Sequence, residues 1–381
     1  MQEMGDVRVE RDTISYNAAV SACEKSREWM RALQLLCEMA EGRVDRSIIS
    51  YNAAISACEK GGVWCWALQL LPEMVSSSVE KDTISYSAAI SACEKGGAWW
   101  WGLHLFREMA EECVEMNALT FSAVAISCAK AGQWGGAVQL LQQMVDGHVE
   151  RDIILYNSVI SACEKSGEWG QALQLLFEMA DGHLERSTNS YNSAISACEK
   201  KGQWSWALQL FSDMTDSHVT RDTISYNAAI SACEKAEVWL RALQLLSEMG
   251  SSRVEKDTIS YSAAVSACEK CGVWWQALHL LREMTESLVE SNVFTYSAAI
   301  SSCEKGGEWL RALELLQRMT VIRIDRGVLS FNAAISACEK MREWRHALQL
   351  LQDMVDASIQ GTSVTYSAAV SACEKGHEWG R

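Results

Sequence analysis

Residues 13–47 read TISYNAAVSACEKSREWMRALQLLCEMAEGRVDRS, and variants of this stretch fill the whole chain. If Thr13 is numbered as position 1 of a 35-residue unit, ten complete repeats span residues 13–362. A fixed period of this length predicts a fold of stacked repeats. The aromatic residue at position 4 marks the register without insertion or deletion: Tyr16, Tyr51, Tyr86, Phe121, Tyr156, Tyr191, Tyr226, Tyr261, Tyr296, Phe331 and Tyr366.

Each unit carries two helical patterns. From Tyr16 to Cys23, apolar residues recur at i, i+3, i+4 and i+7, which is typical of an amphipathic helix. A second apolar stripe runs from Trp29 to Met39, and residues 24–28 between the two are predicted to form a turn.

One such hairpin cannot bury both of its apolar stripes, so neighbouring hairpins must stack. The predicted fold is therefore all-α, an αα-hairpin solenoid that winds as a right-handed superhelix of about twenty-one helices without a sheet. Residues 1–12 match positions 24–35 and are predicted to be the tail of a truncated repeat. Residues 363–381 are predicted to be an incomplete eleventh repeat.

Cysteine occupies position 11 of every repeat, on the apolar stripe of the first helix. This placement predicts buried, reduced thiols that act as small hydrophobic residues and form neither disulfides nor metal sites. The isolated CxxC motif of Cys268 and Cys271 has no second copy, and we expect no metal, no cofactor and no enzymatic activity. The position-11 residues are Cys23, Cys58, Cys93, Cys128, Cys163, Cys198, Cys233, Cys268, Cys303, Cys338 and Cys373.

Tryptophan at position 17, as in Trp29, and methionine at position 27, as in Met39, lie on the stripe of the second helix. Because stacking on a ligand would require another helical phase, both are predicted to belong to the core.

Positions 35 and 5 are polar and variable. Position 35 holds residues suited to cap the following first helix, among them Ser47, Asp82 and Asn117. Position 5 alternates between Asn and Ser, as in Asn17 and Ser87, although neither residue favours a helix. A ladder of one exchangeable donor or acceptor group per repeat is what modular base reading requires.

The period, the Ser15-Tyr16-Asn17 entry, Ala32-Leu33 and Met39 resemble the pentatricopeptide repeat family, and the likeness covers essentially the whole chain. The uniform units resemble its P-type class. The resemblance implies binding of single-stranded RNA at about one base per repeat. It also implies a chloroplast or mitochondrial location and a role in RNA processing, stabilisation or translation.

In that family, positions 5 and 35 select a base and position 2 sandwiches it. The resemblance implies base recognition by Asn17, Ser47, Asn52, Asp82, Ser87, Asn117, Ser122, Asp152, Asn157, Ser187, Asn192, Asp222, Asn227, Asp257, Ser262, Asn292, Ser297, Asn332 and Thr362. Position 2 is apolar in all repeats except the sixth, which has Asn189.

The family's pairing rules imply a base for each pair of residues. Asn with Asp resembles a uridine reader, Ser with Asn an adenosine reader, Ser with Asp a guanosine reader and Asn with Ser a cytidine reader. The pair Asn332 and Thr362 implies a pyrimidine, whereas Ser297 with Gly327 implies no base. Read 5′ to 3′ along the chain, the predicted site is CUAGCUUANY.

The resemblance also implies phosphate contacts from the position-13 lysines. These are Lys25, Lys60, Lys95, Lys130, Lys165, Lys200, Lys235, Lys270, Lys305, Lys340 and Lys375.

The sequence has 34 Lys and Arg residues and 49 Asp and Glu residues, which gives a net charge of -15. This acidic balance argues against nucleic-acid binding driven by charge alone. At 100° per residue, position 13 lies about 20° from position 2, and position 12 lies equally near position 5. Position 12 is Glu except at Ala129, so the groove alternates Lys and Glu. Position 34 is usually basic, as in Arg46 and Lys81, and adds positive charge. An acidic scaffold for a protein partner remains the alternative, as does an amplified array without a ligand, and we expect a monomer.

Overall fold

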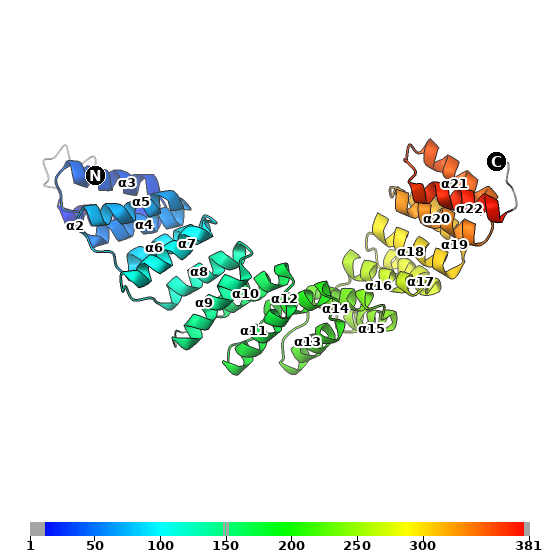
Figure 1. The fold of residues 1–381 in the computed structure, drawn as a ribbon, viewed down its shortest axis with the longest axis horizontal. Helices are drawn as coiled ribbons and strands as arrows, with labels where there is room; N and C mark the ends of the chain where they lie inside the picture. The colour runs from blue at the N-terminus through cyan, green and yellow to red at the C-terminus, as the bar shows by residue number, and fades with distance from the viewer. Residues whose placement is uncertain (1–11, 148, 150–151, 377–381) are drawn as a thin grey trace. The chain divides into compact units, whose positions relative to one another are not determined.

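The computed structural model describes residues 12–147, 149 and 152–376, and these residues form twenty-one α-helices and no strand. The predicted all-α hairpin array is thereby confirmed. Each of the ten complete repeats contributes a first helix that starts at position 1 and a second helix that starts at the position-17 tryptophan (Figure 1). The helices divide into two compact units, residues 1–185 and 186–381, which are described separately.

In the first unit, the first helices are α2 (Thr13–Ser26), α4 (Ile48–Gly61), α6 (Thr83–Lys95), α8 (Ala118–Lys130) and α10 (Ile153–Ser166). The second helices are α3 (Trp29–Glu41), α5 (Trp64–Ser76), α7 (Trp99–Glu111), α9 (Trp134–Asp146) and α11 (Trp169–Asp181).

In the second unit, the first helices are α12 (Thr188–Lys200), α14 (Thr223–Lys235), α16 (Thr258–Lys270), α18 (Val293–Gly306), α20 (Val328–Lys340) and α22 (Ser363–Lys375). The second helices are α13 (Trp204–Asp216), α15 (Trp239–Ser251), α17 (Trp274–Glu286), α19 (Trp309–Val321) and α21 (Trp344–Asp356).

Within each unit, a first helix packs against the next first helix and against the second helices on both sides of it in sequence. Each second helix packs only on its flanking first helices among the described residues. Within each unit, the first helices therefore form a layer of neighbours, to which the second helices attach in pairs. Positions 2 and 5, which are predicted to contact RNA, lie in the first helices, and position 35 directly precedes each of them.

The core is formed by the aromatic residue of position 4, the cysteine of position 11 and the methionine of position 27. Tyr51, Cys58 and Met74 in the second repeat are fully buried, and the same positions are buried in almost every repeat. The prediction of buried position-11 thiols is confirmed, and all fifteen cysteines are free. Cys268 is buried whereas Cys271 is exposed and donates to the Glu237 carbonyl, so the CxxC thiols do not converge.

The prediction that the position-17 tryptophans belong to the core is wrong. Trp29 is only half-buried, and Trp204 is 40% exposed. Each described position-17 tryptophan starts a second helix, and the rings of Trp29, Trp64, Trp274 and Trp344 lie against the glycine at the end of the next first helix. A Cβ atom added at Gly61 would come within 2.5 Å of the Trp29 ring, which explains why glycine suits this turn. Trp379 lies outside the described residues.

Proline does not interrupt its helix. Pro72 lies inside α5, which continues from Trp64 to Ser76. The proline has no amide hydrogen to donate to the preceding turn, a defect that typically costs about 3 kcal/mol in a helix interior.

No helix among the described residues combines the length and the apolar character needed to cross a membrane. Those residues also contain no group of three or more His, Cys, Asp or Glu side chains placed to hold a metal ion.

We predict that a maleimide will label four of the fifteen cysteines quickly in the native protein, namely Cys37, Cys65, Cys113 and Cys271. Burial raises the pKa of Cys58 to about 11 and that of Cys93 to about 12, so both remain protonated thiols near neutral pH. Mass spectrometry before and after denaturation checks this, with all fifteen labelled in denaturant. Rapid native labelling at position 11 would show that these thiols are accessible.

Residues at position 31 adopt left-handed backbone conformations although none is glycine. Leu288 has a φ of 57° and a side chain that is 91% exposed. A left-handed conformation costs a non-glycine residue about 1–2 kcal/mol. The other strained residues at this position are Arg43, Ser78, Cys113, His183, His218, Arg253, Arg323 and Ser358.

Leu288→Gly is therefore expected to raise the free energy of unfolding by about 1 kcal/mol. Ser287→Gly is the matched control, because Ser287 has a φ of -82° and should gain nothing. Urea denaturation of both variants gives the comparison, and a destabilised Leu288→Gly protein would contradict this account of strain.

Candidate functional site

The predicted base-reading residues lie next to one another in the structure although they are 30 residues apart in sequence. Position 35 ends one repeat and caps the first helix of the next, so its side chain reaches position 5 of the preceding first helix. In the second repeat, Asn52 Nδ2 donates to Asp82 Oδ1 at 3.1 Å and to Oδ2 at 3.3 Å. Asp82 Oδ1 also accepts from the Ser85 amide at 2.8 Å, which caps α6.

Burial raises the pKa of the Asp82 carboxyl, but the hydrogen bonds from Ser85 and Asn52 outweigh it and leave that pKa below its usual value. The carboxylate is therefore ionised at neutral pH. Its Oδ2 atom accepts only from Asn52 and retains capacity for a ligand.

The same arrangement recurs in the other Asn repeats. Asn192 donates to Asp222 at 3.0 Å, and Asn227 donates to Asp257 at 3.1 Å. Asn17 donates to Ser47 at 3.1 Å, and Asn332 donates to Thr362 at 3.4 Å. The Oδ1 atoms of Asn17, Asn192 and Asn227 are buried without a hydrogen-bond partner among the described residues. The remaining Asn pair, Asn157 with Ser187, is divided between the two units, which are described separately.

Serine at position 5 behaves differently. Ser262 Oγ donates to the Thr258 carbonyl of its own helix at 2.6 Å, and Ser87 makes the equivalent bond to Thr83. The Oδ1 atom of Asn292, which is the partner in the eighth repeat, caps α18 by accepting from the Thr295 amide at 2.9 Å. In the two Ser–Asn repeats, the Oδ1 atoms of Asn117 and Asn292 cap the next helix, and their Nδ2 atoms have no hydrogen-bond partner among the described residues, whereas the described Asn repeats bind position 5 to position 35.

The side chains of position 2 project from the first helices as a row of exposed apolar groups. Ile14 is 77% exposed, Phe294 65% and Leu329 72%. The remaining members are between 59% and 64% exposed: Ile49, Ile84, Leu119, Ile154, Ile224, Ile259 and Val364. Asn189 is also exposed but polar. Exposed apolar residues at such regular spacing indicate a surface that receives a ligand.

Three of these groups, Phe294, Leu329 and Val364, line a groove in the second unit. It has a volume of about 940 Å³ and is lined by Phe294, Ser297, Gly327, Leu329, Asn332 and Val364, among others. Apolar walls from position 2 thus flank polar groups from positions 5 and 35. Such an arrangement can hold a flat ring between two walls while its edge makes hydrogen bonds.

The position-13 lysines are exposed but paired with carboxylates. Each of eight lysines contacts the position-12 glutamate of the preceding repeat, at distances from 2.7 Å for Lys95 with Glu59 to 3.5 Å for Lys305 with Glu269. The other pairs are Lys60 with Glu24, Lys130 with Glu94, Lys235 with Glu199, Lys270 with Glu234, Lys340 with Glu304 and Lys375 with Glu339. We call this row the Glu–Lys ladder.

One lysine of the first unit escapes the ladder. Lys165 is exposed and has no carboxylate partner among the described residues, because Ala129 stands where other repeats carry glutamate. The helical pattern predicted that Lys and Glu would alternate along the groove. It did not reveal the pairing, whose only sequence signal is the spacing of 36 residues between partners.

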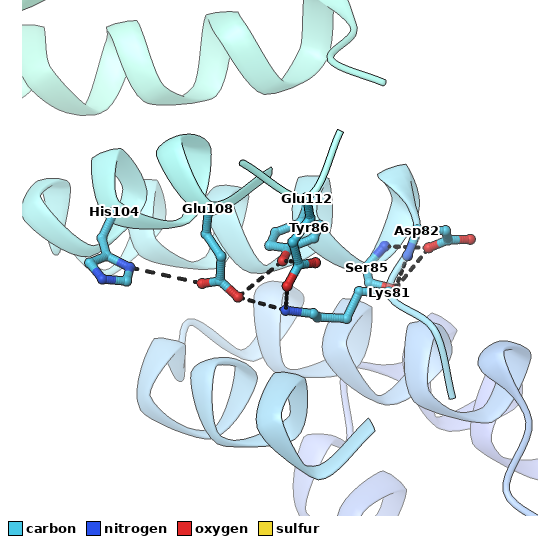
Figure 2. A network of polar contacts seen from close by, with 7 residues as sticks. All are labelled: Lys81, Asp82, Ser85, Tyr86, His104, Glu108 and Glu112. Atoms are coloured by element: carbon cyan, nitrogen blue, oxygen red, sulfur yellow. Dashed lines mark hydrogen bonds and ion pairs between the residues drawn. The ribbon is translucent and has the colours of Figure 1, made fainter. Parts of the chain in front are cut away.

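Described position-34 cations such as Lys81 are held within their helix pairs, contrary to the prediction that position 34 adds positive charge to the groove; Arg151 lies outside the described residues. Figure 2 shows Lys81 Nζ held by Glu108 at 2.6 Å and by Glu112 at 2.7 Å. The ammonium group lies 5.0 Å from the centre of the Tyr86 ring, and the Tyr86 hydroxyl donates to Glu112 at 2.8 Å. The Lys81 side chain is only 7% exposed, so it ties the loop before α6 to α7 instead of facing a ligand.

This clamp recurs with variations. Arg46 lies over the Tyr51 ring and bonds to Glu73, and Lys256 lies over the Tyr261 ring and bonds to Glu283. Adjacent residues therefore have separate tasks, as Asp82 bonds to Ser85 at the start of α6 while Lys81 bonds to Glu108 and Glu112 (Figure 2).

Several solved structures resemble this chain in fold. The pentatricopeptide repeat protein PPR10 from maize is 18% identical with a TM-score of 0.47, and the match covers 99% of this chain and 68% of that chain. PPR10 in complex with an 18-nt psaJ RNA element is 22% identical with a TM-score of 0.49, covering 97% of this chain and 52% of that chain. Yeast Rmd9p in complex with a 16-nt target RNA is 10% identical with a TM-score of 0.40, covering 96% and 94%.

The chain spans about half the length of the PPR10 chain in that RNA complex. No curated protein matches the sequence.

Models of one repeat family match throughout the sequence. The PPR repeat model matches residues 84–114, 224–254, 259–287 and 329–359, and the PPR repeat family model matches residues 186–235. The pentatricopeptide repeat domain model matches residues 1–60, 104–166, 139–201 and 279–341, more than half of the sequence. The chain therefore belongs to the pentatricopeptide repeat family.

Proposed function

We propose that this protein binds single-stranded RNA sequence-specifically, at about one base per repeat, in the processing, stabilisation or translation of chloroplast or mitochondrial RNA. The observation that carries the proposal is the row of exposed apolar position-2 residues beside the position-5 and position-35 groups. An apolar pair of walls suits the faces of a base, and the polar pair suits its edge.

The polar pairs give this proposal its base specificity. In Asn repeats the position-5 amide donates to the side chain of position 35. In the second repeat, Asp82 Oδ2 can still accept a further hydrogen bond from a ligand. In the sixth repeat, Asn192 Oδ1 is buried and has no partner among the described residues. In Ser repeats, Asn292 keeps its amide donors available. The two kinds of pair thus present different donor and acceptor patterns, which is the requirement for telling bases apart.

The Glu–Lys ladder makes the electrostatic part of binding small. A lysine paired with a carboxylate must give up that contact before it can neutralise a phosphate, so its net contribution falls. We therefore expect stacking and edge contacts to supply most of the affinity and binding to depend weakly on salt. An acidic surface that recruits a basic protein is the competing function, supported by the net charge of -15.

The base-reading proposal is tested at the sixth repeat. The double variant Asn192→Ser, Asp222→Asn is expected to shift preference at the sixth base of CUAGCUUANY from uridine toward adenosine by about tenfold, which corresponds to about 1.4 kcal/mol. Low-salt fluorescence anisotropy with ten-mers that differ only at that base provides the measurement.

The seventh repeat is the internal control, because Asn227 and Asp257 are unchanged and preference for uridine at the seventh base should persist. Equal affinity for the ten-mer and its scrambled version would exclude base reading. If no RNA binds at low salt, the protein-scaffold function is favoured.

The ladder itself is tested with Lys165 and Lys130. Lys165→Ala is expected to weaken RNA binding several-fold and to reduce the salt slope by about 0.7, the value for one phosphate contact in a single strand. Lys130→Ala should have a smaller effect, because Glu94 already neutralises Lys130 at 2.7 Å.

Ala129→Glu provides a further comparison, since it supplies the missing carboxylate opposite Lys165 and should reproduce most of the loss. Equal effects of Lys165→Ala and Lys130→Ala would show that the ladder does not restrain the lysines.

A further inference from the structure

A separate groove lies between the second helices α5 and α7, which contain none of the positions predicted to contact RNA. Among the described residues these two helices make no contact with each other, because each packs on its flanking first helices. The space between them has a volume of about 730 Å³ and is lined by side chains from Trp64 to Val75 and from Trp101 to Glu108. Ligand sites in proteins commonly measure about 300–1,000 Å³.

Most of the groove surface is apolar and open to solvent. Trp101 is 45% exposed and Val75 is 58% exposed, although both side chains are large and apolar. Trp64 and Leu68 extend the same surface along α5. Exposed apolar side chains that gather in a concave surface indicate a place where a partner binds.

Pro72 helps to keep this groove open. It lines the groove at position 25, where other repeats carry longer side chains such as Arg107 and Phe177. A side chain of that length at residue 72 would extend into the space that the compact proline ring leaves.

One end of the groove offers a carboxylate oxygen that no described residue binds. Glu108 Oε1 accepts from Lys81 at 2.6 Å and from the Tyr86 hydroxyl at 3.0 Å. Its Oε2 atom faces His104 Nδ1 at 3.9 Å, which is beyond hydrogen-bond distance (Figure 2). The Glu108 side chain is 31% exposed and lines the groove, so a ligand can reach this carboxylate.

The charges and rings at this end favour an arginine side chain. The single ammonium group of Lys81 is shared by the carboxylates of Glu108 and Glu112, so with His104 neutral the cluster has one excess negative charge. The His104 ring lies 5.7 Å from the Trp101 ring, measured between centroids. A guanidinium group is planar and always charged, stacks on aromatic rings and donates to carboxylates.

We propose that this groove binds a basic segment of a partner protein, in which an arginine donates to Glu108 Oε2 and a neighbouring apolar side chain packs on Trp64 and Trp101. A small free cation would leave most of the apolar surface uncovered, whereas a peptide that carries both groups covers both parts of the groove. The net charge of -15 also attracts a basic partner. The site goes beyond the proposed RNA binding and does not depend on it.

Cys65 reports on occupation of the groove, because its exposed thiol lines it. The probe is the peptide GSALRLASG with blocked ends, added at millimolar concentration. We expect it to slow the labelling of Cys65 by N-ethylmaleimide several-fold and to leave Cys37 and Cys271, exposed thiols outside the groove, unchanged. The same peptide with citrulline in place of arginine keeps the shape without the charge and should bind about tenfold more weakly.

Two pairs of variants assign the contacts, with melting temperature as the check on folding. Glu108→Gln should weaken the arginine peptide about tenfold and change the citrulline peptide little. Glu73→Gln is the matched control, because Glu73 also bonds to a position-34 cation, Arg46, but does not line this groove. Trp101→Ala should weaken both peptides, whereas Trp66→Ala, which removes a ring that is equally 45% exposed, should weaken neither.

The outcomes separate this inference from its alternatives. Unchanged labelling of Cys65 with the arginine peptide, or equal protection by the citrulline peptide, would overturn it. Equal protection by arginine amide alone would show that the groove takes a free guanidinium compound instead of a protein segment, and protection by the ten-mer RNA would assign the groove to RNA. Protection by the peptide in a protein that binds no RNA would support the inference and exclude only the proposed function.

Discussion

In most of the described repeats, a hydrogen bond from the third amide of the first helix to the side chain of position 35 organises the predicted binding face. In Asp82 the accepting oxygen also binds Asn52 of the preceding helix, so a single atom starts one helix and orients the polar group of another. Because the cap defines where the helix begins, it also sets the phase at which position 2 projects into the groove. Local helix chemistry and ligand geometry therefore depend on the same contact.

Charge in this protein is arranged mainly for neighbouring repeats. Lys81 is satisfied by Glu108 and Glu112 within its helix pair, and the Glu–Lys ladder links successive first helices. Exposed ion pairs of the ladder kind each contribute about 0–1 kcal/mol, so their larger effect is on the groove, where they cancel most of the positive charge. A chain with a net charge of -15 can then present a groove of low net charge, in which Lys165 stands out.

Much of the fold could be predicted from the sequence, because the same residue types recur at the same positions of every repeat. An ambiguous residue in one repeat is therefore interpreted from the others. The helix pairs, the buried Cys58 and its equivalents, and the proximity of Asn52 to Asp82 all follow from the period. The prediction for Trp29 was wrong because it lies at the first residue of its helix, where the turn of the next repeat covers it instead of the core. The Glu–Lys ladder and the Lys81 clamp join residues of different helices, so no helical wheel for one helix contains them.

The neighbour-only packing of the helices has a consequence for how such a protein can change. Over their thirteen shared positions, helices α14 and α2 differ by one residue, and no described contact within either unit reaches beyond an adjacent hairpin. Unequal recombination between two such gene segments would add or remove a whole 35-residue unit and leave every remaining interface intact. If each unit reads one base, that event would lengthen or shorten the recognised RNA by one nucleotide, so a new target is reached in a single genetic step without an unstable intermediate.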